Sequence, residues 1–359
     1  MPGRSRRASA VLAVLVVAAV GCQADKPVSQ APPSTSAPTS TVPPTLTPVR
    51  PHLEPPPRPP RMTRNPLTGR LGVPSGPVIA VKIDNTGPAR PQVGLESADV
   101  VYVEQVEGGQ TRLVAVFASR RPRRVEPVRS VRNADPELLA GYGRVALAYS
   151  GGAGGPLATL HRSPLIDASP AAKGFAYHRD GSRHAPYNLA VDLPRLAARL
   201  PRATARVRDV GFRWDGRADS RLARARQVTR LTAVIGTTAV SFRWDWRGHR
   251  WVQTAPDGSV RRSASGTPLG APNVILQFCP VTVDRTDVDV RGAPSAYTHT
   301  IGTGRAVVFR DGRGVVGRWV RPTRGAPTRF VDAAGRDLAL KPGGVWVLLV
   351  PAGGRWAAR

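Results

Sequence analysis

Three apolar segments rich in β-branched residues lie close together in the chain, and they constrain its fold more than any other feature. They span residues 78–83, 100–106 and 113–118. Their length and composition predict strands that are buried in the interior of a sheet. Ligands of open α/β folds bind where such strands end. The sequence therefore predicts a ligand site at the ends of these strands.

Polar and charged side chains gather at these predicted strand ends. They are Asp84 and Asn85 after the first segment, Glu104 and Glu107 late in the second, and Arg112, Arg129 and Arg132 around the third. A guanidinium group binds a carboxylate or phosphate through paired hydrogen bonds, so the arginines predict an anion site. The alternative is that they pair with Asp84, Glu104 or Glu107 and only brace the sheet.

Other kinds of site can be weighed in the same region. Asp84 and Glu107 would form an acid–base pair of the glycosidase type if their carboxylates were suitably spaced. The long loop at 150–190 adds His184 and Asn188 as candidate ligand-binding residues, because long ordered loops are often functional. The histidines of this loop lack the compact spacing of a zinc motif, and we predict no metal.

The pattern around the three segments predicts an α/β-type mixed-sheet domain over residues 62–205. A fourth strand is expected at 144–149, and short helices at 91–98, 133–141 and 191–200, with Asp135 as an N-cap. The pair Gly108 and Gly109 follows one strand and precedes another. It therefore predicts a tight turn and not a phosphate-binding loop, and we expect no nucleotide cofactor.

From about residue 206 the pattern changes to short alternating segments separated by turn pairs such as Asp257-Gly258 and Asp311-Gly312. Strands are predicted at 229–235, 238–246, 249–254, 273–279, 305–310, 313–320 and 345–350. This predicts a β-rich domain over 206–359, and the whole chain is of the α+β class. Most tryptophans on these strands should be core, but Trp244 and Trp246 share a strand face and are a candidate exposed pair for stacking on sugars.

The first 22 residues have the pattern of a bacterial signal peptide. Three arginines precede a short apolar segment, which ends in Ala19-Val20-Gly21-Cys22, a sequence similar to a lipobox. We predict that Cys22 carries a lipid that anchors the protein on the extracytoplasmic face of the cell membrane. The alternative is a secretory signal with an incidental cysteine. Residues 23–61 are rich in Pro, Ser and Thr and predict a disordered linker.

The chain of 359 residues has a formal net charge of +28, which would ordinarily suggest a polyanion partner. Almost all of the positive charge is arginine scattered along the sequence, and no nucleic-acid-binding module is present, so we expect no nucleic-acid partner. The second cysteine, Cys279, lies in an apolar strand and is predicted to be a buried, inert thiol.

Several segments, taken in order, resemble the YerB-like family of bacterial lipoproteins, whose domains have no assigned function. They are Asn65-Pro66-Leu67-Thr68-Gly69, AVKIDN, Ala89-Arg90-Pro91-Gln92, Gly94-Leu95, Ala98-Asp99-Val100-Val101-Tyr102, Glu107-Gly108-Gly109, Thr111-Arg112, Pro127-Val128-Arg129-Ser130, Arg132, Ala185-Pro186, Asn188-Leu189, Asn273-Val274-Ile275-Leu276-Gln277, Gly302-Thr303-Gly304 and FRDGRGVVGRW. The resemblance implies a lipoprotein with an α/β N-terminal domain and a β-rich C-terminal domain. It supplies no catalytic residues. Tyr187 stands where this pattern leads us to expect a histidine.

Together these features favour a lipid-anchored envelope protein that is not an enzyme. Its site would bind an anionic wall polymer or a lipid-linked ligand through Asp84, Glu107, Arg112, Arg129 and Arg132. One alternative is an envelope hydrolase or transferase that uses Asp84 or Glu107. The other is a scaffold that recruits proteins through its β-rich domain.

Overall fold

The structure is a computed structural model that describes residues 63–72, 76–217, 220–289 and 292–359. Residues Pro59–Arg359 form one compact unit. The predicted signal peptide, the lipidation site Cys22 and the linker at 23–61 lie outside the described residues. No helix in the described part of the chain combines the length and the apolar character needed to cross a membrane.

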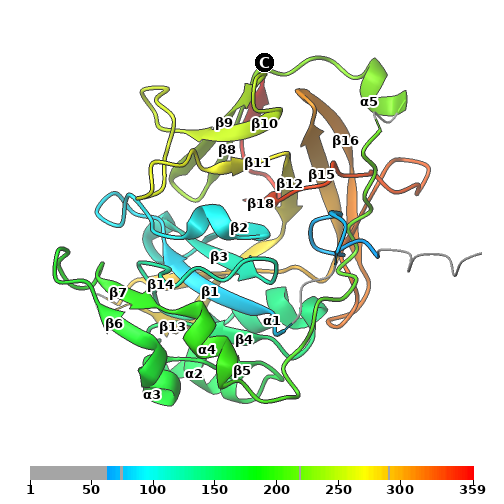
Figure 1. Ribbon diagram of the computed structural model, residues 1–359. Coiled ribbons are helices and arrows are strands. Elements are labelled where there is room, and N and C mark those ends of the chain that lie inside the picture. Colours follow the sequence, from blue (N-terminus) through cyan, green and yellow to red (C-terminus); the bar gives the residue numbers. More distant parts are fainter. Residues whose placement is uncertain (1–62, 73–75, 218–219, 290–291) are drawn as a thin grey trace, which may run out of the picture. The chain divides into compact units, whose positions relative to one another are not determined.

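Strands from both halves of the chain form one large sheet, which within the described residues has ten strands (Figure 1). Its order is β17-β16-β15-β12-β18-β2-β3-β1-β4-β5. The N-terminal half supplies β1 (Ile79–Asp84), β2 (Val100–Gln105), β3 (Thr111–Phe117), β4 (Ala146–Ala148) and β5 (Ile166–Asp167). The C-terminal half supplies β12 (Asn273–Cys279), β15 (Gly302–Arg310), β16 (Arg313–Arg321), β17 (Arg329–Val331) and β18 (Val345–Pro351).

The two halves meet where β18 pairs with β2 in parallel, with Val345 opposite Val100 and Leu348 opposite Val103. Both faces of the sheet are covered, so its central strands are apolar on both sides, as the continuous apolar segments predicted. The strand predictions at 78–83, 100–106 and 345–350 are confirmed. The predicted boundary between residues 205 and 206 lies inside the compact unit and does not divide this sheet.

A second sheet lies over the C-terminal strands (Figure 1). In the part of the chain that is described it has five strands, in the order β11-β10-β9-β8-β19. They are β8 (Arg230–Ile235), β9 (Thr238–Asp245), β10 (Arg250–Thr254), β11 (Gly270–Ala271) and β19 (Trp356–Ala358). Two separate hairpins pair β6 (Tyr177–Arg179) with β7 (Leu189–Val191), and β13 (Val281–Val288) with β14 (Pro294–Thr298). The α+β class is confirmed.

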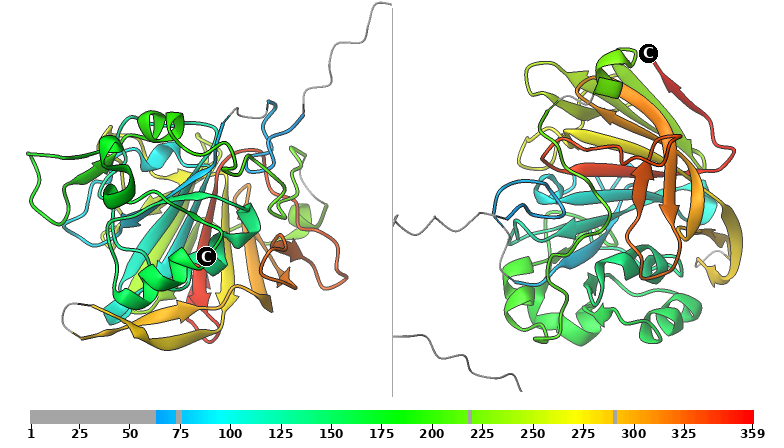
Figure 2. Two further views of the ribbon diagram at one scale, coloured as in Figure 1. Left: turned by 90° about the horizontal axis from the view of Figure 1, so that it is seen from below. Right: turned by 90° about the vertical axis from the view of Figure 1, so that its right-hand side faces the viewer.

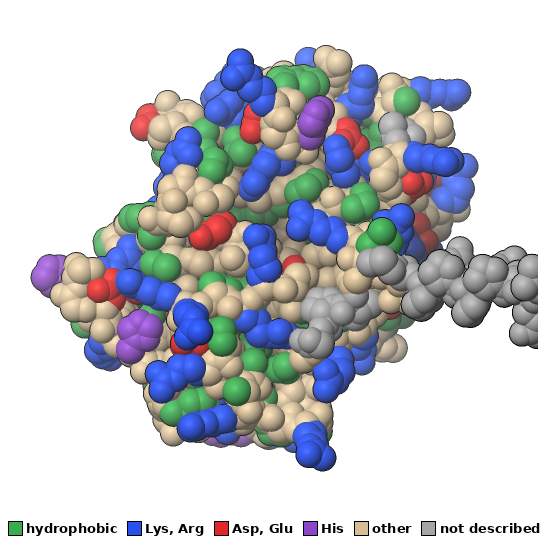
Figure 3. All heavy atoms as spheres, viewed as in Figure 1, with side chains coloured by type: hydrophobic (Ala, Val, Ile, Leu, Met, Phe, Trp, Pro, Cys, Tyr) green, Lys and Arg blue, Asp and Glu red, His purple; other side chains and the backbone are tan. Residues whose placement is uncertain are grey.

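The helices are short and lie on both faces of the large sheet. They are α1 (Asp135–Leu139), α2 (Gly154–His161), α3 (Pro170–Lys173), α4 (Leu193–Ala198) and α5 (Ser220–Arg224). α1 and α2 pack on the face that carries Ala80 and Val116, and α4 packs on the opposite face, which also contacts the second sheet. Figure 2 shows hairpin β13–β14, coloured amber, beside α2. On the face in Figure 3, Lys and Arg are spread among other side chains.

Some local predictions are corrected by the structure. The helix expected at 91–98 is only a 3₁₀ turn at Leu95–Ser97, because Gly94 before it has a left-handed backbone (φ 74°). Asp135 does not cap α1 through its side chain, and it pairs instead with a buried lysine. Trp244 and Trp246 are not an exposed pair: Trp244 is 4% exposed and packs on Trp251 at 5.3 Å between ring centroids.

Candidate functional site

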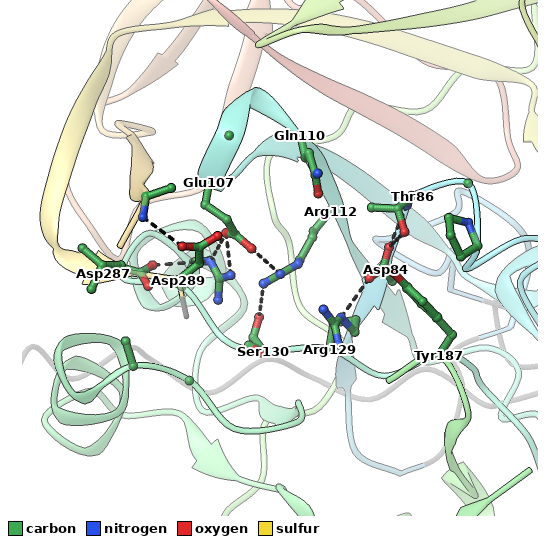
Figure 4. Close-up of a pocket in the computed structure, with 18 residues that line it drawn as sticks. Asp84, Thr86, Glu107, Gln110, Arg112, Arg129, Ser130, Tyr187, Asp287 and Asp289 are labelled. Atoms are coloured by element: carbon green, nitrogen blue, oxygen red, sulfur yellow. Dashed lines mark hydrogen bonds and ion pairs between the residues drawn. The ribbon is translucent and has the colours of Figure 1, made fainter. Parts of the chain in front are cut away.

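A cavity of about 910 Å³ opens at the ends of β1 and β3, where the sequence predicted a site (Figure 4). The charged residues that line it are Asp84, Glu107, Arg112, Arg129, Arg132, Asp287 and Asp289. All five residues of the predicted anion-binding cluster are therefore brought together. The lining also includes Gly152 and Ala153 before α2, Thr86, Tyr187 and residues of hairpin β13–β14.

Strand register explains why these side chains meet. Asp84, the last residue of β1, lies opposite Arg112 of β3 in the antiparallel pair. β2 and β3 are joined by a tight turn at Glu107–Gly109, where Gly108 and Gly109 have positive φ angles of 61° and 69°. The predicted turn is thus confirmed, and it places Glu107 beside Arg112 at the same edge of the sheet.

Glu107 is the centre of a buried ion-pair network. Its Oε1 contacts Nη2 of Arg112, and its Oε2 accepts a hydrogen bond of 2.8 Å from Nε of Arg132. Burial alone would raise the pKa of Glu107, but Arg112 and the hydrogen bond from Arg132 outweigh it and lower the pKa. Glu107 is therefore ionised at neutral pH and orients two guanidinium groups along the cavity wall.

Asp84 orients the third arginine. Its Oδ2 lies 2.8 Å from Nε of Arg129, and its Oδ1 accepts hydrogen bonds of 2.7 and 2.6 Å from the backbone N and Oγ1 of Thr86. The Arg129 guanidinium also lies 5.8 Å from the ring centroid of Tyr187. Tyr187, which replaces the expected histidine, thus takes part in the site through its aromatic ring and not through an imidazole.

A lysine that we did not predict as a site residue lies beneath this network. Lys82 of β1 is fully buried, contacts Glu104, and lies 2.7 Å from Oδ1 of Asp135. Burial lowers its pKa to about 8 despite the attraction of Asp135. Of the three acids named as alternative partners of the arginines, Glu107 and Asp84 do pair with arginines, whereas Glu104 contacts Lys82. The sequence feature that could have identified Lys82 is its position inside an otherwise apolar strand segment.

The C-terminal half contributes two further carboxylates, Asp287 and Asp289, from hairpin β13–β14. Asp287 is 2% exposed, and its Oδ2 lies 3.5 Å from Nε of Arg132. Burial raises the pKa of Asp287, and Glu107 adds to this effect. Sequence analysis missed these residues because no strand was predicted there, although three aspartates precede an Arg-Gly pair in the sequence.

Three predicted residues lie outside the cavity lining. Asn85 is buried, and its Nδ2 donates a 2.9 Å hydrogen bond to Oγ1 of Thr111, which holds the end of β1 against β3. Asn188 accepts a 2.7 Å hydrogen bond from Arg179, and His184 is exposed. Among the described residues, no three His, Cys, Asp or Glu side chains are grouped to hold a metal ion.

Comparison with protein families assigns both halves of the chain. Residues 67–206 match the family described as "Protein of unknown function (DUF3048) N-terminal domain", and residues 231–347 match its C-terminal domain. The chain belongs to this family. The resemblance to the YerB-like proteins is thereby confirmed.

Sequence and structure comparisons with YerB of Bacillus subtilis support this assignment. The chain is 44% identical over 64 residues to "Putative lipoprotein YerB" of Bacillus subtilis (strain 168), a match that spans 18% of this chain and 19% of that protein. The match thus spans about a fifth of the length of that relative. The crystal structure of YerB protein from Bacillus subtilis has the same fold, with a TM-score of 0.67, 20% identity, and coverage of 82% of this chain and 99% of that one.

Proposed function

We propose that this member of the family is a lipid-anchored protein on the outer face of the cell membrane that binds an anionic envelope ligand in the arginine-lined cavity. The proposal rests on the hydrogen bonding of the Arg129 guanidinium group. Asp84 holds it through Nε, and no described residue makes a hydrogen bond to its Nη1 or Nη2. Two charged donors at the cavity wall are a binding fork for a carboxylate or phosphate.

The electrostatics of Arg112 support the same ligand class. Burial lowers its pKa to about 10, and the nearby charges of Arg132 and Arg129 contribute to the decrease. An anion bound between these guanidinium groups would offset their mutual repulsion. Glu107 and Asp84 raise the pKa of Arg112 in turn, but burial and the two neighbouring arginines outweigh them.

A second candidate function, a hydrolase or transferase, is favoured by one observation. Glu107 and Asp287 both contact Arg132, yet the pKa of Glu107 is lowered and that of Asp287 is raised. Two carboxyl groups with opposite shifts are a common arrangement for an acid and a base. The acid would then be Asp287, whereas Glu107, the residue expected from the sequence, is unsuited to donate a proton.

An affinity experiment separates these functions. The full chain carrying Cys22→Ser is immobilised and exposed to an envelope extract of the producing cells, and mass spectrometry identifies retained and released molecules. Binding predicts a retained anionic molecule that Arg129→Gln loses by about tenfold or more, as expected for a charged hydrogen-bond pair. Arg243→Gln, an exposed arginine on β9, is the matched control.

Three outcomes would contradict the binding proposal. Equal retention by wild type and a folded Arg129→Gln variant would remove Arg129 from the site. New cleavage or transfer products that disappear in Asp287→Asn would instead establish an enzyme. Retention of proteins alone, unaffected by Arg129→Gln, would favour the scaffold.

A further inference from the structure

A second cavity, of about 490 Å³, adjoins the arginine-lined cavity and is lined by other residues of the same hairpin, β13–β14. The two cavities share their dividing wall. Asn133 and Thr286 line the second cavity, and their chain neighbours Arg132 and Asp287 line the first. Nδ2 of Asn133 donates a 3.0 Å hydrogen bond to Oγ1 of Thr286, so the loop before α1 and strand β13 are joined at this wall.

Close packing fixes the position of the hairpin. A Cβ atom at Gly155 of α2 would lie 2.3 Å from the backbone oxygen of Thr286, so only glycine allows α2 to approach β13 this closely. α2 also supplies Thr159 to the second cavity. The cavity therefore has walls from α1, α2 and the hairpin.

The chemistry of the second cavity differs from that of the first. Neither Lys nor Arg lines it, although the chain has a net charge of +28. Its side chains are carboxylates, an amide, hydroxyl groups, a phenol and an imidazole. Tyr297 and His299 present two neighbouring rings whose centroids are 4.8 Å apart, and Val283, at the same cavity, is 64% exposed. The lining thus combines hydrogen-bonding groups with apolar surface.

Both carboxylates of the cavity already have partners within the protein. Glu137 accepts a 2.6 Å hydrogen bond from the backbone N of Thr300 and one of 3.0 Å from the Tyr297 hydroxyl. Asp284 accepts hydrogen bonds of 2.6 Å from Asn133 and 2.9 Å from the backbone N of Thr286. These hydrogen-bond partners are all neutral groups.

The charge state of Asp284 decides which ligands are excluded. Burial would raise its pKa, but the hydrogen bonds from Asn133 and Thr286 outweigh burial and lower it. Asp284 is therefore ionised at neutral pH and disfavours an anion in this cavity. The other polar groups of the lining are hydroxyl groups, a phenol and an imidazole, which can donate and accept hydrogen bonds. Two of them already pair within the protein, because Oγ1 of Thr282 lies 3.0 Å from Nε2 of His299.

We propose that the second cavity is a subsite for a neutral saccharide. Sugar hydroxyl groups match a wall of neutral donors and acceptors, and the C–H face of a sugar ring matches Val283 and the Tyr297–His299 pair. This inference rests on the proposed function of the first cavity. The full ligand would then be a glycan whose charged group binds at Arg129 and whose uncharged sugar extends into the adjoining second cavity.

The test uses the full chain with Cys22→Ser and three neutral probes, namely chitotriose, cellotriose and maltotriose, each titrated to about 10 mM, a range that detects weak binding. Binding is measured by NMR chemical-shift changes. Thr282→Val removes an exposed hydroxyl from the cavity without changing side-chain shape, and Thr238→Val on β9 is the matched control. We expect at least one probe to bind, and Thr282→Val to weaken its binding about fivefold, the value of one hydrogen bond.

The outcomes separate this proposal from the first. Saccharide binding that survives Arg129→Gln but is weakened by Thr282→Val supports the second cavity. This conclusion does not depend on whether the anion is retained in the affinity experiment. Loss of the retained anion in Arg129→Gln without any saccharide binding supports the first cavity and overturns the second. Binding of spermidine at the Thr282 site in place of the three sugars would also overturn the proposal, because it would identify a cation site.

Discussion

The Glu107 carboxylate and the Arg132 guanidinium are joined by a hydrogen bond of 2.8 Å between Oε2 and Nε, and both side chains are buried. Arg112 contacts the other carboxylate oxygen. One carboxylate thus holds two cations at the end of the sheet. A buried charge that loses its partner costs far more free energy than an exposed one. Removing one member of this pair should therefore lower the stability of the fold.

Glu107→Gln should lower the free energy of unfolding by about 3 kcal/mol or more, because it removes the carboxylate that pairs with buried Arg112 and leaves buried Arg132 with its longer, 3.5 Å contact to Asp287. Urea unfolding measures this change. Glu96→Gln is the control, since the Oε1 of Glu96 accepts its hydrogen bond from the Ser265 hydroxyl and not from an arginine. If both variants unfold at the same urea concentration, the network does not stabilise the fold.

The same pair predicts a pH dependence. The pKa of Glu107 is lowered in the folded protein, so its contribution to stability is present above the usual pKa of 4.5 and is lost as pH falls through the folded value. The difference between wild type and Glu107→Gln should therefore shrink in acid. A constant difference from pH 7 to about pH 2 would contradict the assigned direction.

Lys82→Met should also destabilise the protein, by about 3–5 kcal/mol, because Glu104 and Asp135 would remain buried without their cation. The triple variant with Glu104→Gln and Asp135→Asn should recover part of the loss. Chemical denaturation of the three proteins tests both statements. A single variant as stable as wild type would show that this pairing does not secure α1 to the sheet.

Cys22→Ser should move the protein from the membrane fraction to the soluble fraction, because the acyl chains would be absent. Detergent phase partition and intact-mass measurement of the wild-type protein provide the test, with a lipid mass expected on Cys22. An identical distribution of the two proteins would contradict lipid anchoring and favour an ordinary secretory signal.

Cys279 should not react with iodoacetamide in the folded protein at pH 8. Its side chain is fully buried, and burial raises its thiol pKa, so little thiolate is present or accessible. The Cys22→Ser background leaves Cys279 as the single thiol of the chain. Labelling is expected to be complete in urea, and prompt labelling of the native protein would show that β12 opens readily.

Part of the site could be predicted from the polar residues at the ends of apolar strand segments. Asp84, Glu107 and Arg112 were predictable because each lies within a few residues of an apolar strand segment, and antiparallel register then places them at one edge. Asp287 was not predictable in this way. It reaches Arg132 across 155 residues of sequence, and only the packing of hairpin β13–β14 against α2 and the β2–β3 turn brings it there.

The sequence by itself determined the central strand segments, the α+β class and the position of the first cavity, because these follow from local apolar patterns and from residues next to them. Tertiary structure decided that β18 pairs with β2, that Lys82 is the partner of Glu104, and that the second half of the chain completes the site. Such choices depend on contacts between distant segments. The free energies of these contacts come from the burial of apolar surface and from the pairing of strands and charges, which a local sequence pattern does not specify.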